Sequence, residues 1–433
     1  MKTIILSLFI LSPLVMAQHN NRSARDLQFR FGNPGARSLG FGGAFLGLAD
    51  DATAPVANPA GMARTAKISL SLEVQYESRS ETIPFGGGSI TQTNLFEFDF
   101  DFNPQTASHN QFRVPYAAVV IPKGRWRWSV FVHQQADLKR AYTTDRIEVD
   151  LLSPTSSIDS YAPSSDLLQL DMTNYGVSIG SEIGSHLAWG CSLFYSDMSY
   201  RSNSTIHLTD QIGTQIPVAQ LAHGDDQDVG GFLGLLWTVN EAFSVGATYK
   251  RQGEFDYQAS LEATRPNEDN PNFSRSARFR VPDSFGLGLS VRPSDRTTFN
   301  ADFNRVYYSQ ITDNLVDFAN VPEVRQSMTD VTEIHIGFEL AFINAQNPWF
   351  LRLGYWLDPY HAAVNDIEDS QILRGSSVDP GIRDIFFLHQ FAEDTDHYSL
   401  GWGMTMGQHI QIDLAIETSD VGEIGTLSGI YRF

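Results

Sequence analysis

A two-residue alternation of apolar and polar side chains is the feature that most limits how this chain can fold. In the segment 67–76 every second residue is apolar, and the residues between are polar or charged. The same alternation recurs at 332–342, 349–358 and 409–418. Successive side chains of a β-strand point to opposite faces, so each segment predicts a strand with one apolar and one polar face.

The length of the apolar runs limits the fold further. Beyond the first residues, no run approaches the roughly 18 consecutive apolar residues of a transmembrane helix. The sequence begins with a charged Lys2 and the apolar run Ile4–Met16, which predicts a signal peptide over residues 1–17. No cysteine lies near the expected cleavage site, so a lipid anchor is not expected. The exported chain is then either a secreted soluble protein or a membrane-spanning closed β-barrel, because lipid tolerates no other strand arrangement.

The spacing of turns favours the barrel. Short turns are expected at 122–124, 183–186, 239–242, 293–296, 343–348 and 407–409. Longer connections are expected at 79–111, 138–167, 202–227, 258–275, 310–329 and 359–394, with a tight one near 420–422. Six turns on one side and seven connections on the other predict an all-β fold, a transmembrane antiparallel barrel of about fourteen strands over residues 67–433.

Two segments refine this prediction. The segment 95–102 alternates like a strand but would reverse the sidedness of every later turn, so we expect it to protrude within the first long connection. The chain ends with Tyr431 and Phe433 in an alternating strand, the usual ending of barrels that are assembled into the bacterial outer membrane. We therefore expect Tyr431 and Phe433 to form the membrane-assembly signal that the barrel-assembly machinery reads.

Composition excludes several functions. The net charge is −20, so a nucleic-acid partner, which needs a basic surface, is not expected. Cys191 is the single cysteine, which excludes a disulfide framework and a cysteine-based metal cluster. No local signature places a nucleophile beside a base, so we expect no enzyme, no cofactor and no metal. The low charged fraction, 18%, and high aromatic fraction, 12%, suit a wall that faces lipid.

The N-terminal segment 18–66 has a different character. Residues 32–64 do not alternate and are rich in small residues, as is needed where backbone packs closely. In this segment, Gly35 to Arg64 and the motif Asn58, Pro59, Ala60 resemble the outer-membrane transporters of long-chain fatty acids and aromatic hydrocarbons. The resemblance implies a hatch inside the lumen of a fourteen-stranded barrel, and passive uptake of hydrophobic solutes such as fatty acids or hydrocarbons. The longer N-terminal extension of this chain departs from that family.

Two alternatives stay open. A similar hatch signature occurs in the barrel subunit that shuttles cargo in a bacterial protein-secretion system. A structural or adhesive outer-membrane barrel is the third hypothesis. In all three cases we expect an outer-membrane location in a Gram-negative bacterium, with outer-membrane lipids and lipopolysaccharide as neighbours.

Candidate site residues follow from these hypotheses. The candidates for first capture of a hydrophobic solute are Phe96, Phe98, Phe100, Phe102, Phe386, Phe387 and Phe391. These aromatics would otherwise pack the outer connections together. Lys250 and Arg352 face the lumen and are candidate contacts for a carboxylate headgroup, or else members of ion pairs that brace the lumen. Asn58 is expected to cap or turn the hatch backbone. The acidic segments 225–228 and 393–396 lack the spacing of a calcium-binding loop and are expected to be solvated loops.

Overall fold

The structure is a computed structural model, and its secondary structure is described for most of the chain. The described residues are 31–83, 86–94, 97–150, 160–161, 163–209, 215–263, 273–312, 325–361, 364–366 and 394–433. The predicted signal peptide 1–17 lies outside them. Among the helices in these ranges, none is long and apolar enough to cross a membrane.

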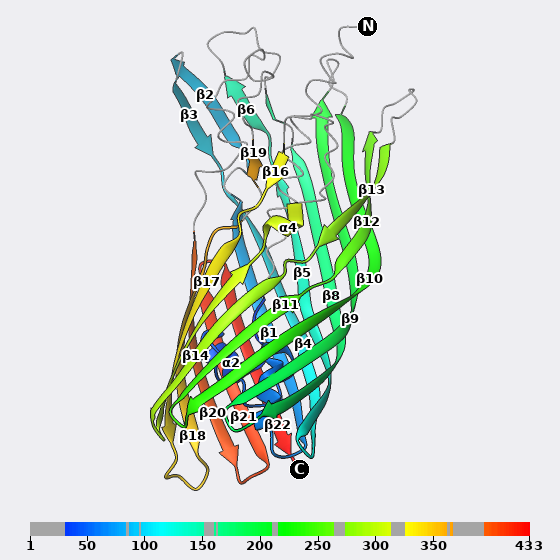
Figure 1. The fold of residues 1–433 in the computed structure, drawn as a ribbon. Coiled ribbons are helices and arrows are strands. Elements are labelled where there is room, and N and C mark those ends of the chain that lie inside the picture. Colours follow the sequence, from blue (N-terminus) through cyan, green and yellow to red (C-terminus); the bar gives the residue numbers. More distant parts are fainter. Residues whose placement is uncertain are drawn as a thin grey trace.

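One antiparallel sheet closes on itself around a lumen (Figure 1). The first strand, β1, pairs with the last, β22, and β10 pairs with β11, which closes the ring. Further along, β10 pairs with β12, and β12 pairs with β13. Counting β11 with β12, and β13 with β14, as single interrupted strands gives fourteen, which confirms the predicted fold. The strands are β1 (Ser69–Ile83), β4 (Gln105–Lys123), β5 (Trp126–Thr144), β8 (Ser164–Ile183), β9 (Leu187–Thr209), β10 (Gln215–Asn240), β11 (Phe243–Arg251), β12 (Glu254–Ala263), β13 (Phe273–Arg280), β14 (Ser284–Ser294), β15 (Thr297–Val306), β17 (Val331–Phe342), β18 (Trp349–Asp358), β20 (Thr395–Met406), β21 (Ile410–Ser419) and β22 (Gly422–Arg432).

The outward face carries an apolar belt. Exposed Leu, Val and Ile side chains alternate along the strands with inward polar ones, as the periodicity predicts. Exposed tyrosines lie at the edge of the belt toward the long connections: Tyr76, Tyr175, Tyr195, Tyr249 and Tyr398. Trp128, Trp237 and Phe433 lie toward the short turns, all six of which are confirmed. Two aromatic girdles thus bound the belt.

Several strands run far past the girdle, which corrects the predicted connections. Strand β10 extends over Gln215–Asn240 and pairs with β9 as far as Gln215, so a connection over 202–227 is wrong. The acidic segment 225–228 lies within β10 and not in a loop. Beyond the belt the outward face of β10 no longer lies against lipid, so residues 215–227 show no regular apolar–polar alternation although the hydrogen-bonded ladder continues.

Two neighbouring strands are interrupted at the level where the belt ends. Gly253 separates β11 from β12, and Pro282, which has no N–H to donate, separates β13 from β14. Side chains replace the missing ladder bonds. Asp283 accepts a hydrogen bond from the backbone N–H of Gln252 at 3.0 Å, and Asp228 of β10 accepts one from Glu254 at 2.8 Å.

A small separate sheet lies over one end of the barrel. It consists of β2 (Gly88–Asn94), β3 (Glu97–Phe102), β6 (Ile147–Asp150) and β7 (Ser160–Tyr161), and the strands β16 (Arg325–Ser327) and β19 (Val364–Asp366) pair nearby. Strand β3 pairs with β2 and not with the barrel, which confirms the protruding strand predicted for 95–102. A one-turn helix, α4 (Ser309–Thr312), follows β15.

The N-terminal segment lies inside the barrel, near the end that carries the short turns (Figure 1). It contains α2 (Ala36–Gly40), α3 (Ala54–Ala57) and the 3-10 helix η1 (Pro59–Arg64). Helix η1 contacts β8, β9 and β10, while α2 contacts β20 and β21. Residues 33–66 are called the hatch below.

Candidate functional site

Inward side chains of the barrel hold the backbone of the hatch. The buried carboxylate of Asp302 on β15 accepts hydrogen bonds from the N–H groups of Phe45 (2.6 Å) and Leu46 (2.8 Å). On β1, Glu73 accepts one from the N–H of Gly35 at 2.7 Å. Further bonds between wall side chains and hatch backbone involve Tyr116, Ser192, Ser244, Asn300, His335, Ser399 and Ser428. The wall therefore satisfies polar groups that the short hatch helices leave open.

Asn58, in the predicted hatch motif, is fully buried and joins hatch to wall. Its side-chain oxygen accepts a hydrogen bond from the N–H of Ala60 at 3.1 Å and caps η1, which begins at Pro59. Its Nδ2 donates to the carbonyl of Leu46 at 2.9 Å and to that of Leu235 on β10 at 3.1 Å. One amide thus fixes two hatch segments against one strand.

Glycines in the wall allow this close approach. On seven strands, a side chain at an inward glycine would collide with hatch atoms. At Gly337 an added Cβ would lie 2.6 Å from the carbonyl oxygen of Phe41, and at Gly401 it would lie 2.9 Å from the Cα of Gly40. We call this set the glycine ring: Gly190, Gly234, Gly246, Gly288, Gly337, Gly354 and Gly401. The hatch backbone therefore packs directly on the wall backbone.

Ion pairs add a second attachment near the short turns. Asp50 of the hatch lies 2.5 Å from the guanidinium of Arg37 and 3.0 Å from that of Arg292, at the end of β14. Burial alone would raise the pKa of the Asp50 carboxyl, but Arg37, Arg292 and Arg64 outweigh burial and hold that pKa below its usual value. Asp50 is thus ionised and bridges hatch and barrel.

Beyond the hatch, one side of the lumen is lined by apolar side chains. On β8, Gly180 faces the hatch at Pro59, whereas Met172 and Leu170 lie eight and ten residues further toward the long connections, buried and pointing inward. We call the set they belong to the upper apolar cluster: Leu168, Leu170, Met172, Met198, Phe255, Tyr257, Ala259, Ala277, Phe279, Val281, Val306, Tyr308, Ile311, Met328 and Val331. A polar interior is usual in such barrels, so this lining is a specific feature.

The other side of the lumen is polar and aromatic. Trp356 on β18 stacks between His335 and His397, with ring centroids 5.1 Å and 3.9 Å away. Glu417 accepts a hydrogen bond from Trp356 Nε1 at 3.0 Å and lies 3.1 Å from His397 Nδ1. The lumen beyond the hatch therefore has an apolar side and a side of hydrogen-bonded polar groups.

The two candidate headgroup contacts differ in their surroundings. Arg352 is almost fully buried, and its guanidinium binds Glu339 at 2.8 Å and Asp413 at 2.7 Å. Arg352 therefore braces the lumen through ion pairs, the second of the two roles considered for it from the sequence. Lys250 is buried too, but it donates to the neutral amide oxygen of Asn33 at 3.2 Å and lies 5.4 Å from the ring centroid of Phe232. Lys250 is thus the better placed of the two to exchange its partner for a carboxylate.

The predicted capture aromatics are only partly described. Phe96, Phe386, Phe387 and Phe391 lie outside the described residues. Phe98 and Phe100 lie in β3, and only their strand positions are described; Phe102 ends β3 with a half-exposed side chain. At the other end of the barrel, the rings of Tyr431 and Phe433 are exposed and meet edge-to-face at 4.8 Å.

Three features were not predicted from the sequence: the glycine ring, the upper apolar cluster and the His335–Trp356–His397 stack. An isolated glycine inside a strand pattern indicates that another backbone approaches closely, so the glycine ring could have been predicted from the sequence. The cluster is harder to find, because its members come from seven elements and the segments that connect them, and they belong to no single alternating run.

Comparison with known proteins gives matches in structure and none in sequence. No protein-family model and no curated protein matches the chain. A Pseudomonas aeruginosa FadL homologue matches with a TM-score of 0.67 at 15% identity, over 94% of this chain and 99% of that one. The Pseudomonas putida toluene transporter TodX matches with 0.60 at 15% identity, over 93% and 99%. The Ralstonia pickettii toluene transporter TbuX matches with 0.58 at 16% identity, over 93% and 99%. At these identities the likeness concerns the fold of the whole chain.

Proposed function

We propose that this chain is a passive outer-membrane channel for uptake of hydrophobic solutes, such as long-chain fatty acids or aromatic hydrocarbons. The observation that carries the proposal is the upper apolar cluster, which lines the lumen beyond the hatch. An apolar solute gains nothing from a water-filled pore, whereas burial against apolar side chains contributes about 25 cal/mol per Å². The fold shared with a FadL homologue and with toluene transporters supports the same function.

The hatch sets the direction of the route. The glycine ring and the wall hydrogen bonds fix it across the half of the lumen near the short turns. A solute that enters from the side of the long connections meets the apolar cluster first and the hatch below it. It then leaves sideways through the wall, or onward after the hatch shifts. Lys250 is the proposed contact for a carboxylate headgroup on this route.

The remaining assignments belong to the same proposal. Residues 1–17 are a signal peptide, 18–66 an extension with the hatch, and 67–433 the barrel. The exposed rings of Tyr431 and Phe433 are the contact for the barrel-assembly machinery, and lipopolysaccharide surrounds the girdle toward the long connections. No nucleophile, cofactor or metal takes part in passive uptake.

Uptake in a strain that lacks the gene tests the proposal. Cells complemented with the wild type should take up labelled oleate or toluene faster than cells with an empty vector. The double variant Leu168→Gln/Leu170→Gln places two amides in the apolar cluster and should reduce that rate, because a buried amide without a partner costs about 1–3 kcal/mol.

The matched control is Leu167→Gln, the same substitution on the outward face of β8. It should leave uptake at the wild-type rate. Wild-type and empty-vector cells with equal uptake across a panel of fatty acids and hydrocarbons would refute the transport function. Secretion components or cargo that co-purify stoichiometrically would favour the shuttle instead.

A further inference from the structure

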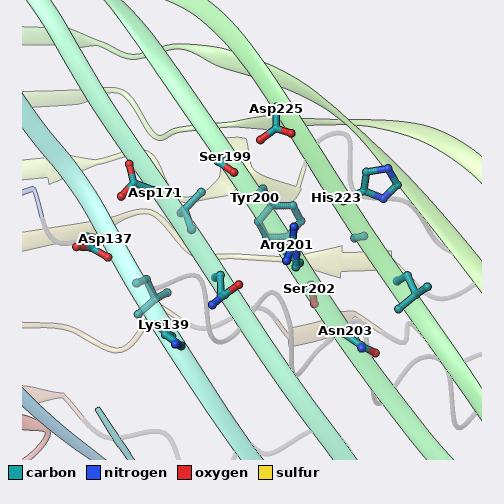
Figure 2. A pocket seen from close by; sticks show the side chains of 15 residues that line it. Asp137, Lys139, Asp171, Ser199, Tyr200, Arg201, Ser202, Asn203, His223 and Asp225 are labelled. Carbon is teal, nitrogen blue, oxygen red and sulfur yellow. The ribbon is translucent and has the colours of Figure 1, made fainter. Parts of the chain in front are cut away.

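The outer face of the barrel carries a hollow beyond the apolar belt. Its volume is about 540 Å³, and fifteen residues of β5, β8, β9 and β10 line it (Figure 2). Tyr175 of β8 and Tyr195 of β9 point outward into the girdle. Residues an even number away on the same regular strand share that face, so Asp171 and Arg201 also point outward. The hollow is therefore on the outside of the wall and separate from the lumen.

The strand register orders the charges of this hollow into two rows. The row nearer the belt, called the acidic row, pairs Asp137 with Asp171, Asp171 with Ser199, and Ser199 with Asp225 across four strands. The next outward row, called the basic row, pairs Lys139 with Gln169, Gln169 with Arg201, and Arg201 with His223. Figure 2 shows members of both rows side by side on the four strands.

The two rows do not neutralise each other by direct contact. Gln134 donates to Asp137 at 3.2 Å and to Asp171 at 3.1 Å, which holds these carboxylates close together. Within the described part of the chain, no hydrogen bond or ion pair engages Lys139 or Arg201, and both are exposed. Two cations thus lie free beside a cluster of hydrogen-bond acceptors.

The position of the hollow identifies what covers it. Asp171 lies four residues beyond Tyr175, and Arg201 six beyond Tyr195, which is about 13–20 Å along a strand at about 3.3 Å per residue. If the belt lies in lipid, this level is the headgroup zone of the same leaflet. A second hollow of about 500 Å³ continues outward along these strands and shares Asn203 with the first. The face suits an extended polar headgroup whose lipid chains lie against the belt.

We propose that these rows bind the anionic sugar headgroup of an outer-leaflet glycolipid, that is, lipopolysaccharide. Lys139 and Arg201 donate to its phosphate or acidic-sugar oxygens, while the carboxylates of the acidic row accept hydrogen bonds from sugar hydroxyls. The proposal rests on the outer-membrane location proposed above and is independent of transport. It gives the barrel a fixed lipid on the β5–β10 side.

Native mass spectrometry of the purified, delipidated full chain tests it. The probes are lipid A that bears acidic core sugars, the same lipid without phosphates, phosphatidylglycerol, and inorganic phosphate alone. The wild type should bind the first probe best. Lys139→Ala/Arg201→Ala should bind it about tenfold less, as expected for the loss of two exposed charge contacts.

The matched control is Arg251→Ala/Arg305→Ala, which removes two outward cations on other strands near the girdle. This variant should bind lipid A like the wild type. Equal weakening by both double variants, or none by Lys139→Ala/Arg201→Ala, would overturn the site. So would equal binding of phosphatidylglycerol, or full competition by inorganic phosphate. Leu168→Gln alone changes the upper apolar cluster but no residue that lines the hollow, so it should slow uptake and keep lipid A binding. Failure of the transport proposal therefore remains distinguishable from failure of this one.

Discussion

Replacement of Gly337 by alanine tests whether the glycine ring holds the hatch. A Cβ at this position would lie 2.6 Å from the carbonyl oxygen of Phe41, whereas ordinary contact begins near 3.4 Å. Hatch and wall must therefore separate by 3.4 − 2.6 = 0.8 Å. Nearby, the carbonyl of Gly42 lies 2.7 Å from His335 Nδ1, and its N–H donates to Ser399 at 3.1 Å. A shift of 0.8 Å stretches these distances to about 3.5 and 3.9 Å, beyond useful hydrogen bonding.

The expected cost combines two effects. Overpacking of a close-packed site costs about 1–3 kcal/mol, and each weakened hydrogen bond about 1 kcal/mol. We expect the docked hatch of Gly337→Ala to lose about 3 kcal/mol, which is roughly a hundredfold in the population of undocked states. Hydrogen exchange at the amides of Phe45 and Leu46, which donate to Asp302, reports that population.

Gly429→Ala is the matched control, because a Cβ at this strand glycine meets nothing within 4 Å. Its hatch exchange should equal that of the wild type, and heat-modifiable gel mobility should show both variants as closed barrels. Wild-type exchange rates in Gly337→Ala would refute the claim that wall glycines fix the hatch. Equal acceleration in both variants would assign the effect to strand glycines in general.

Three further perturbations probe the charged groups. Asp50→Asn removes the carboxylate that lies 2.5 Å from the guanidinium of Arg37 and should speed hydrogen exchange of the hatch amides about tenfold. Asp50→Glu is the conservative control. Unchanged exchange in Asp50→Asn would contradict the ion-pair bridge between hatch and barrel. The pKa of Asp50 is lowered, so its ion pairs stabilise the docked hatch fully above the unfolded-chain pKa of about 3.9, and this stabilisation is lost only as pH falls through the lower folded pKa. Hatch exchange of the wild type, corrected for intrinsic rates, should therefore rise in that pH range. Hatch exchange of Asp50→Asn should not rise there. Arg352→Met leaves Asp413 and Glu339 buried without their cation. It should lower the free energy of unfolding by about 3–5 kcal/mol in a denaturant titration. A loss below about 1 kcal/mol would show that these ion pairs do not brace the lumen. Lys250→Met should slow uptake of oleate about tenfold and leave toluene uptake unchanged, and equal slowing of both solutes would contradict a headgroup role.

The barrel was predictable because its cause is local. A strand between lipid and lumen must alternate, so segments such as 67–76 and 409–418 show their structure in their own residues. The same reasoning fails outside the belt. Strand β10 continues to Gln215 through residues that mix apolar and polar side chains on both faces. Its ladder there is supported by pairing with β9, which no local pattern records.

The site was predictable only in part. The small residues of the hatch and Asn58 stand out in the sequence, but their partners are single residues on many strands. Gly337 and Asp302 become hatch contacts only when the register of β15 and β17 is known. The upper apolar cluster likewise depends on which strand ends meet across the lumen. Periodicity gives the face of a side chain, and not the residue that it meets there.

The glycine ring also constrains how the protein is assembled. The hatch touches wall backbone on strands from β9 round to β20, and at these glycines there is no room for a side chain between hatch and wall. The hatch leads directly into β1, and the ring is closed by the pairing of β1 with β22. We expect the strands to gather around the hatch before β1 pairs with β22, because that order avoids passing a folded hatch into a closed ring. The hatch is then the core around which the strands of the barrel assemble.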